Sequence, residues 1–99
     1  MKKTELFFGT QKPDGTHVTG WDIQNFLEVN VTRYFTGFTV LESVGFWKGK
    51  EEKGFCVIVL HEGVKVTDKL IDKIRNEYKE LFQQESVLRV DSVPESVSF

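Results

Sequence analysis

The sequence has a single cysteine, Cys56, only two prolines and no long apolar run. One cysteine excludes an internal disulfide and any metal centre that needs several thiolates, so Cys56 is expected to be a small buried apolar residue. The apolar run Phe55–Leu60 is far shorter than the roughly 20 residues that a membrane-spanning helix needs. Because the residues after Met1 also lack the apolar core of a signal peptide, we expect a cytoplasmic protein.

The sequence also lacks an excess of charge of either sign. The 13 basic and 15 acidic residues are interspersed and leave a formal net charge of −2. A protein that binds a phosphate backbone needs a basic surface, so nucleic acid is not expected as a partner. The 39% hydrophobic and 13% aromatic content instead indicates one globular domain over residues 1–99. A domain of this size buries only roughly 60 to 65% of its unfolded surface, so we expect oligomerisation to add stability.

Hydrophobic periodicity predicts four strands and two helices. The strand-length segments are Glu5–Thr10, Phe38–Lys48, Phe55–Leu60 and Val87–Val90, and apolar residues recur at helical spacing from Thr19 to about Tyr34 and from Asp68 to Gln83. Thr19–Asp22 has the form of a capping box with Asp in place of Glu, and Thr67 suits the N-cap of the second helix. The charged segment Gly49–Gly54 is predicted to be the loop between the second and third strands.

The order βαββαβ is that of ferredoxin-like α+β folds. Right-handed crossovers place the first and third strands at the centre of a four-stranded antiparallel sheet. The segments Glu5–Thr10 and Phe55–Leu60 lack alternation, as central strands should. Both helices then lie on one face of the sheet. The other face would expose a larger apolar patch than monomers usually tolerate, so we infer that another subunit of a homo-oligomer covers it.

Three segments have a familiar pattern when taken together: ELFFGTQKPDGTHVT, FLEVNVTRYFTGFTVLESVGFW and YKELFQQESVLRV. They resemble the bacterial and phage family catalogued as domain of unknown function 3574, over nearly the whole chain. The resemblance implies the ferredoxin-like fold and matches Arg33 to an arginine of the family's pattern. No activity is established for that family, so the resemblance indicates where a site lies rather than its chemistry.

Trp47 and Lys48 end the second predicted strand, and Glu52 follows in the next loop. In a ferredoxin-like sheet these positions lie near the start of the third strand and the subunit boundary, so the three side chains could form one ligand-binding pocket. Trp47 would stack on a flat ring, Glu52 would accept from an exocyclic amine or face a cation, and Lys48 would meet an anion. The alternative is an edge-strand tryptophan packed at an interface above a solvated charged loop.

Four polar residues, Gln83-Gln84-Glu85-Ser86, stand where the second helix is expected to end. Polar residues there usually satisfy the last helical carbonyls. This run has no glycine or asparagine cap, however, and Gln84, Glu85 and Ser86 together offer donors, acceptors and charge. We predict that they specify the polar edge of a ligand, with a capping network as the alternative. Arg33, near the end of the first helix, is a further candidate, either for a carboxylate or phosphate or for a structural ion pair.

No metal, cofactor or catalytic nucleophile is predicted. His17 and His61 lack a Cys, Asp or Glu at metal-ligand spacing. Neither G-x-S-x-G, H-E-x-x-H, a P-loop nor G-x-G-x-x-G occurs. Tyr78 and Phe82, one helical turn apart, are expected to belong to the core.

Three functions stay open at this point. The first is a small-ligand-binding or regulatory module, a trimer as in PII-like proteins or a dimer, with an adenosyl-type ligand in clefts between subunits. The second is an enzyme: the E-E-K segment Glu51–Lys53 and the Q-x-x-V-L segment Gln84–Leu88 are distantly similar to phage S-adenosylmethionine-degrading lyases. In such enzymes the substrate's own carboxylate attacks and the protein supplies positioning and electrostatics. That resemblance would put Glu52 near the sulfonium and Trp47 where the lyases have a tyrosine, without its hydroxyl. The third is a structural or protein-interaction role through the sheet face and the segment Val93–Phe99.

Overall fold

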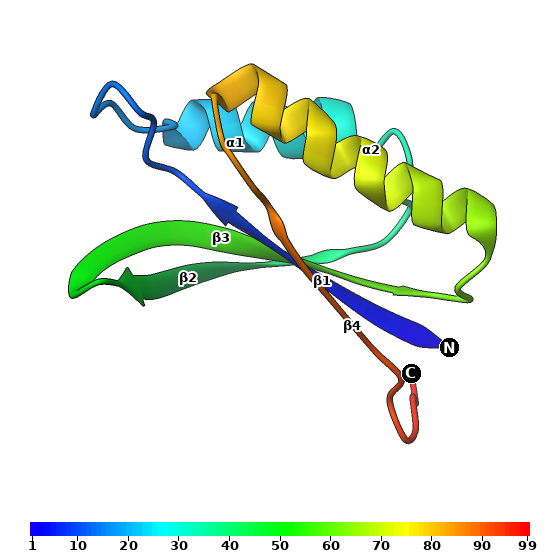
Figure 1. The fold of residues 1–99 in the computed structure, drawn as a ribbon. Coiled ribbons are helices and arrows are strands. Elements are labelled where there is room, and N and C mark those ends of the chain that lie inside the picture. Colours follow the sequence, from blue (N-terminus) through cyan, green and yellow to red (C-terminus); the bar gives the residue numbers. More distant parts are fainter.

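Two helices lie on one face of a four-stranded antiparallel sheet, and the other face of the sheet is bare (Figure 1). The computed structural model describes residues 1–99. The elements in chain order are β1 (Lys2–Gly9), α1 (Gly20–Phe26), η1 (Leu27–Val31), β2 (Thr39–Trp47), β3 (Lys50–His61), α2 (Lys65–Phe82) and β4 (Leu88–Ser92). The strand order β2-β3-β1-β4 confirms the ferredoxin-like fold, with the first and third strands at the centre.

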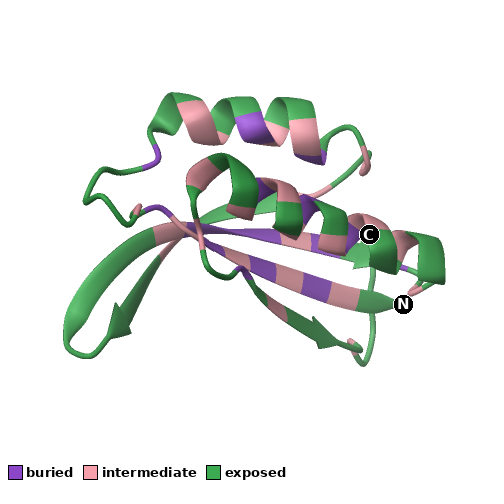
Figure 2. Ribbon diagram, turned by 45° about the horizontal axis from the view of Figure 1, so that its top comes forward, coloured by how far each residue is buried: buried purple, intermediate pink, exposed green.

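The core lies between the helices and the central strands (Figure 2). Alternate residues of β1 and β3 point towards the helices, where Phe8 stacks on its cross-strand partner Phe55 with ring centroids 4.7 Å apart. Tyr78 of α2 meets Phe8 edge-on at 4.7 Å and Phe26 of α1 at 5.0 Å. Tyr78 is fully buried and Phe82 is half-buried against the cluster, which confirms that both belong to the core. Edge-to-face aromatic pairs of this kind each add about 1 kcal/mol beyond their buried area.

The first helix begins as predicted but does not continue to Tyr34. The Thr19 hydroxyl accepts from the Asp22 N–H and the Asp22 carboxylate accepts from the Thr19 N–H, which confirms the capping box. After Phe26 the helix widens into the π-helical turn η1, where the Thr32 N–H donates to the Leu27 carbonyl at 3.0 Å. Thr32 also donates its hydroxyl to a backbone carbonyl one turn earlier. A run of β-branched residues has low helix propensity, which favours this early end.

The prediction of a loop over Gly49–Gly54 is wrong, because all of this segment after Gly49 belongs to β3. The β2–β3 turn consists of Lys48 and Gly49 alone, both with positive φ (51° and 78°), as a tight hairpin requires. Lys50–Lys53 pair with Val44–Trp47 in a hairpin that extends past the helices (Figure 1). No core lies beside this part of the strand, so its side chains are charged and give no apolar signal.

The second helix begins earlier than predicted. Its N-cap is Val64, which offers no side-chain hydrogen bond, so the prediction of Thr67 at the N-cap is wrong. At the other end Gln83 adopts the left-handed conformation (φ 51°, ψ 48°) and donates its N–H to the Lys79 carbonyl. Gln83 therefore takes the capping position that glycine or asparagine usually occupies.

The bare face of the sheet carries one apolar row of cross-strand neighbours and one mixed row. One row joins Leu41, Cys56, Phe7 and Leu88, and the other joins Thr39, Ile58, Glu5 and Val90. Cys56 is buried within its row, as expected, and burial raises the pKa of its thiol. Neither helix has the length and apolarity that a membrane crossing requires.

Candidate functional site

A cleft of about 800 Å³ opens at the end of the sheet where β1 finishes and β3 begins. Its walls come from the β2–β3 hairpin, the loop after β1 and the connection between α2 and β4. Of the residues selected from the sequence, Glu52, Gln84, Glu85 and Ser86 line it. The structure therefore brings together residues that lie more than thirty positions apart in the chain.

The floor of this cleft is a pair of glycines, Gly9 of β1 and Gly54 of β3, which are direct cross-strand partners. A Cβ on Gly54 would lie 2.2 Å from the carbonyl oxygen of Phe8, so the backbones could not approach this closely with any other residue. A Cβ on Gly9 would lie 2.4 Å from Glu52 Oε1 and 3.3 Å from Gln84 Oε1. The space above Gly9 is thus occupied by two side-chain oxygens that arrive from opposite walls.

Gln84 is held in one orientation by its own amide nitrogen. Nε2 donates to the carbonyl of Gln11 at 2.9 Å and to the carbonyl of Phe82 at 3.0 Å. The neighbouring Gln83 instead donates to the carbonyl of Leu81 and serves the helix end. Both residues line the cleft and both donate to a carbonyl of the last helical turn, but only Gln84 also bonds Gln11 in the loop after β1.

The floor is tied to the core by two hydroxyl groups. Tyr78 donates to the carbonyl oxygen of Gly9 at 2.6 Å, and Thr10 donates to the carbonyl of Lys53 at 2.7 Å. Burial raises the pKa of the Tyr78 phenol, and the carboxylates of Asp22 and Glu52 add to this effect. The sequence predicts only a core role for Tyr78. Its one signal is a polar atom in an otherwise apolar helical stripe.

The charges in the cleft have no partners within the chain. The carboxylates of Glu52 and Glu85 form neither a hydrogen bond nor an ion pair, whereas the ammonium of Lys12 lies 5.9 Å from the ring centroid of Phe82. On the far side of Glu52 a second cavity of about 460 Å³ also contains His17. No three His, Cys, Asp or Glu side chains are placed together to hold a metal ion.

Three of the selected residues lie outside this cleft. Trp47 and Lys48 stand at the tip of the hairpin, where Trp47 is 72% exposed and the Lys48 ammonium lies 5.9 Å from its ring centroid. Arg33 is exposed, lies 6.0 Å from the ring of Tyr34 and forms no ion pair. Within one subunit, then, Trp47 and Lys48 do not join Glu52 in a single pocket lining, and their role stays a prediction.

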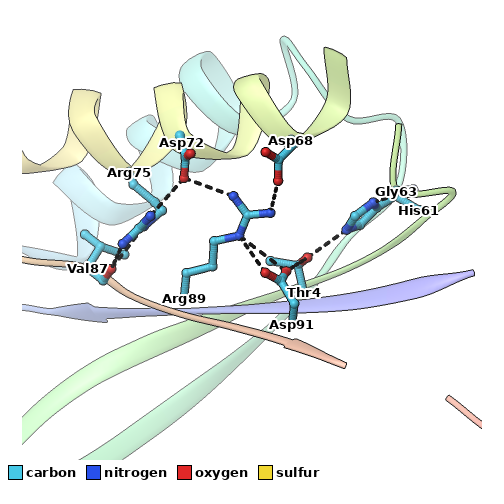
Figure 3. A network of polar contacts seen from close by, with 9 residues as sticks. All are labelled: Thr4, His61, Gly63, Asp68, Asp72, Arg75, Val87, Arg89 and Asp91. Carbon is cyan, nitrogen blue, oxygen red and sulfur yellow. Dashed lines mark hydrogen bonds and ion pairs between the residues drawn. The ribbon is translucent and has the colours of Figure 1, made fainter. Parts of the chain in front are cut away.

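The opposite end of the sheet holds a polar cluster of a different kind, which we call the Arg89 network (Figure 3). It comprises Thr4, His61, Asp68, Asp72, Arg75, Arg89 and Asp91. The Arg89 side chain is only 12% exposed, and its guanidinium pairs with Asp68, with Asp72 at 3.0 Å and with Asp91 at 3.1 Å. Burial lowers the pKa of Arg89, but its bonds to the three carboxylates outweigh burial and raise it overall.

A hydrogen-bonded chain connects this network to β3. His61 Nδ1 accepts from the Gly63 N–H at 3.0 Å, so the neutral ring carries its proton on Nε2 and donates it to Thr4 Oγ1 at 2.7 Å. Thr4 in turn donates to Asp91 at 2.6 Å, and this bond together with Arg89 holds the pKa of Asp91 below its usual value. Burial lowers the pKa of His61. Every buried polar side-chain atom of the chain has a partner.

The fold and the cleft define the class of protein, an α+β ferredoxin-like domain with a polar cleft at one end of its sheet. The family model of DUF3574, described as a protein of unknown function, matches residues 3–99, and the chain belongs to this family. This confirms the family resemblance seen in the sequence. No curated protein matches the chain.

Solved structures share the fold at low sequence identity. A phage SAM lyase in complex with S-methyl-5'-thioadenosine has a TM-score of 0.70 and 19% identity, covering 92% of this chain and 79% of that chain. The apo state of phage SAM lyase has a TM-score of 0.66 and 16% identity, covering 92% of this chain and 78% of that chain. Protein At3g17210 from Arabidopsis thaliana gives 0.57 and 17%, covering both chains completely. Likenesses of this kind show the fold and leave the chemistry to the residues of the cleft.

Proposed function

We propose that this protein is an oligomeric small-ligand-binding module and that the ligand occupies the cleft above Gly9 and Gly54. One observation supports this most strongly: the Glu52 carboxylate and the Gln84 amide oxygen converge over a floor without side chains and have no partner there. Polar groups that converge in a concave site with no structural task are typical of ligand recognition. A ligand of nucleoside size fits a cleft of about 800 Å³.

The oligomer is proposed to form through the bare face of the sheet, as a trimer or a dimer. Leu41, Leu60, Leu88 and Val90 are exposed on this face, and exposed apolar residues gathered on one face of a sheet indicate an interaction surface. Trp47 and Lys48 are assigned to the subunit boundary, because the hairpin that bears them projects beyond its own domain. In this assembly a neighbouring subunit would narrow the cleft, which is open to solvent in a single chain.

A thermal-shift series tests the binding proposal. The purified protein would be heated with S-adenosylmethionine, S-adenosylhomocysteine, S-methyl-5'-thioadenosine, ATP, ADP and cyclic nucleotides. A ligand at 100 times its dissociation constant adds about 2.7 kcal/mol, which raises the Tm of a domain this small by roughly 10 °C or more. Glu52→Gln should reduce the shift, whereas Glu62→Gln, just after the far end of β3, should not. Flat traces with every compound would overturn the nucleoside-type ligand.

The oligomer needs a separate measurement. Trp47→Ala and Glu52→Gln would be compared by analytical ultracentrifugation and by the thermal response to ligand. Loss of assembly in the Trp47 variant with the Glu52 variant still assembled would support a boundary role for Trp47 and a ligand role for Glu52. Dissociation of both variants, without any ligand response in the parent protein, would favour the structural role instead.

A second candidate function is an S-adenosylmethionine-degrading lyase. It is favoured by the fold shared with a phage SAM lyase that holds S-methyl-5'-thioadenosine. In such a reaction the substrate carboxylate attacks its own γ-carbon, the carbon–sulfur bond breaks, and the bonding electrons leave on sulfur, which gives a lactone and S-methyl-5'-thioadenosine. The protein need supply only positioning and a field that suits the sulfonium, which Glu52 could provide. Incubation with S-adenosylmethionine and chromatography for S-methyl-5'-thioadenosine tests this; an unchanged substrate under conditions where it binds would exclude the lyase.

A further inference from the structure

We propose that the Gly9 end of the cleft is a donor-selective subsite, which takes an ammonium group or an amine N–H of the ligand and rejects carboxylates and phosphates. This inference rests on the proposed function, because it names the chemistry of the ligand at one place in that cleft. It follows from which atoms the cleft presents, since an amide side chain can present either a donor or an acceptor.

The orientation of Gln84 decides the first of the two polar atoms. Both hydrogens of Nε2 are engaged, one by the carbonyl of Gln11 and one by the carbonyl of Phe82. A flipped amide would place its oxygen against these two carbonyl oxygens and lose both bonds. The atom that Gln84 turns towards Gly9 is therefore fixed as the acceptor Oε1.

Glu52 supplies the second atom, and it is also an acceptor. Its Oε1 and the Oε1 of Gln84 lie 2.4 Å and 3.3 Å from one point, the position that a Cβ on Gly9 would take. Both oxygens therefore face the same small volume, and one donor group there can bond both once the flexible end of Glu52 moves back by a few tenths of an ångström. Because neither oxygen has a donor in the chain, a group with two N–H bonds would satisfy both, and a positive charge would strengthen the bond to the carboxylate.

The other charged residues of the cleft indicate that only one end of the ligand carries the amine or ammonium group. Glu85 adds a second unpaired carboxylate to the cleft, while Lys12 and Lys53 also line it. A ligand with separate positive and negative groups suits this distribution, with its cationic or amine end at Gly9. An anion at Gly9 would face two acceptor oxygens without a donor, so the subsite excludes it.

The test uses simple ions as probes and does not require the natural ligand. Methylammonium chloride would be titrated into the ¹⁵N-labelled protein against sodium chloride at constant ionic strength, and sodium acetate would be titrated in the same way. Methylammonium should shift the Gly9 backbone amide and the Gln84 side-chain amide signals in a saturable manner, and acetate should not. Equal responses to both ions, or no response to methylammonium, would overturn the subsite.

Variants separate the subsite from general charge effects. Glu52→Gln should weaken the methylammonium response about tenfold, because a charge-assisted bond becomes a neutral one. Gly9→Ala should abolish it, since the new methyl group fills the space, displaces the flexible end of Glu52 and presses on Gln84 Oε1. Glu62→Gln removes the same charge from an exposed position just after β3, at the opposite end of that strand, and should leave the response unchanged. An unaltered response in the Glu52 variant would contradict the proposal even if Gly9→Ala failed to fold.

The two proposals fail in different ways. If nucleosides raise the Tm while methylammonium leaves the Gly9 signal unmoved, the cleft binds ligands but has no donor-selective subsite. If methylammonium binds at Gly9 and all nucleosides leave the Tm unchanged, the subsite stands and the nucleoside assignment falls.

Discussion

Each end of the sheet holds a cluster of polar and charged side chains. The groups are paired with one another at one end and unpaired at the other. At one end Arg89 is surrounded by three carboxylates, and Thr4 and His61 extend the chain of bonds to β3. At the other end the carboxylates of Glu52 and Glu85 have no partner, and the oxygen of Gln84 faces Gly9 without a donor. A complete network leaves nothing for a ligand to satisfy, so it indicates a structural role. An incomplete cluster indicates that a partner from outside the chain completes it.

Arg89→Met gives the largest expected effect on this contrast. The variant keeps a long side chain but leaves three carboxylates without a cation, so the free energy of unfolding should fall by about 2 kcal/mol, less than for a fully buried pair because the carboxylates are partly exposed. The Tm should fall by roughly 10 °C. Urea unfolding at pH 7 measures the change in the free energy of unfolding. Arg33→Met is the matched control and should change stability by less than about 0.5 kcal/mol; similar losses in both variants would remove the distinction between the ends.

Tyr78→Phe tests the tie between the core and the cleft floor. Removal of the hydroxyl leaves the Gly9 carbonyl without its 2.6 Å bond, which should cost about 1 kcal/mol and shift the Gly9 amide resonance. Tyr34→Phe removes a longer bond to Glu77, at 3.2 Å, and should cost less. Denaturant unfolding and an amide spectrum of each variant give both results. A Tyr78 variant with an unmoved Gly9 signal would show that the floor does not depend on this bond.

Acidification should weaken the Arg89 end through His61. Its pKa is lowered by burial in the folded protein, so the unfolded chain binds the proton more readily. The contribution of neutral His61 to the free energy of unfolding is therefore full above the pKa of the unfolded chain, near 6.5. It is lost as the pH falls through the lower pKa of the folded protein. Protonation would also set an Nδ1–H against the Gly63 N–H. The free energy of unfolding, measured by urea denaturation, should fall from pH 7.5 to pH 5. His61→Gln should make this pH dependence shallower, and the control His17→Gln should leave it unchanged.

Glu52→Gln and Glu85→Gln at the open end give the smallest expected effects. Both carboxylates are exposed and unpaired, so each variant should unfold within about 0.5 kcal/mol of the parent protein. Chemical denaturation of each single variant measures this difference. A loss as large as that of Arg89→Met would mean that these residues hold the fold together, and would count against a binding role.

The sequence predicts the sheet order because the buried central strands leave a direct pattern. Uninterrupted apolar segments mark the two central strands, and the capping box of Thr19 and Asp22 marks the first helix. The strand that runs through Lys50–Lys53 could not be predicted, since it projects beyond the helices and has no core to pattern it. A hydrophobic pattern therefore predicts only those elements that pack against the core.

The candidate site is predicted only in part, for a related reason. Gln84 and Glu85 attract attention as polar residues at a helix end without the usual cap. Gln83 takes the left-handed position at the helix end and Gln84 turns its Oε1 towards Gly9, and both depend on backbone geometry that the sequence pattern does not encode. Gly9 likewise reads as the end of a strand, and its role becomes visible only when Gly54 lies opposite and Glu52 folds over it.

The placement of the two tryptophans determines what intrinsic fluorescence can report. Trp21 is 74% exposed and Trp47 is 72% exposed, while phenylalanine and tyrosine build the aromatic core. Unfolding of an isolated subunit would move both indoles from water to water and change their emission little. Burial of Trp47 by a neighbouring chain would shift its emission to the blue. The natural fluorophores of this protein therefore serve as a probe of association rather than of folding.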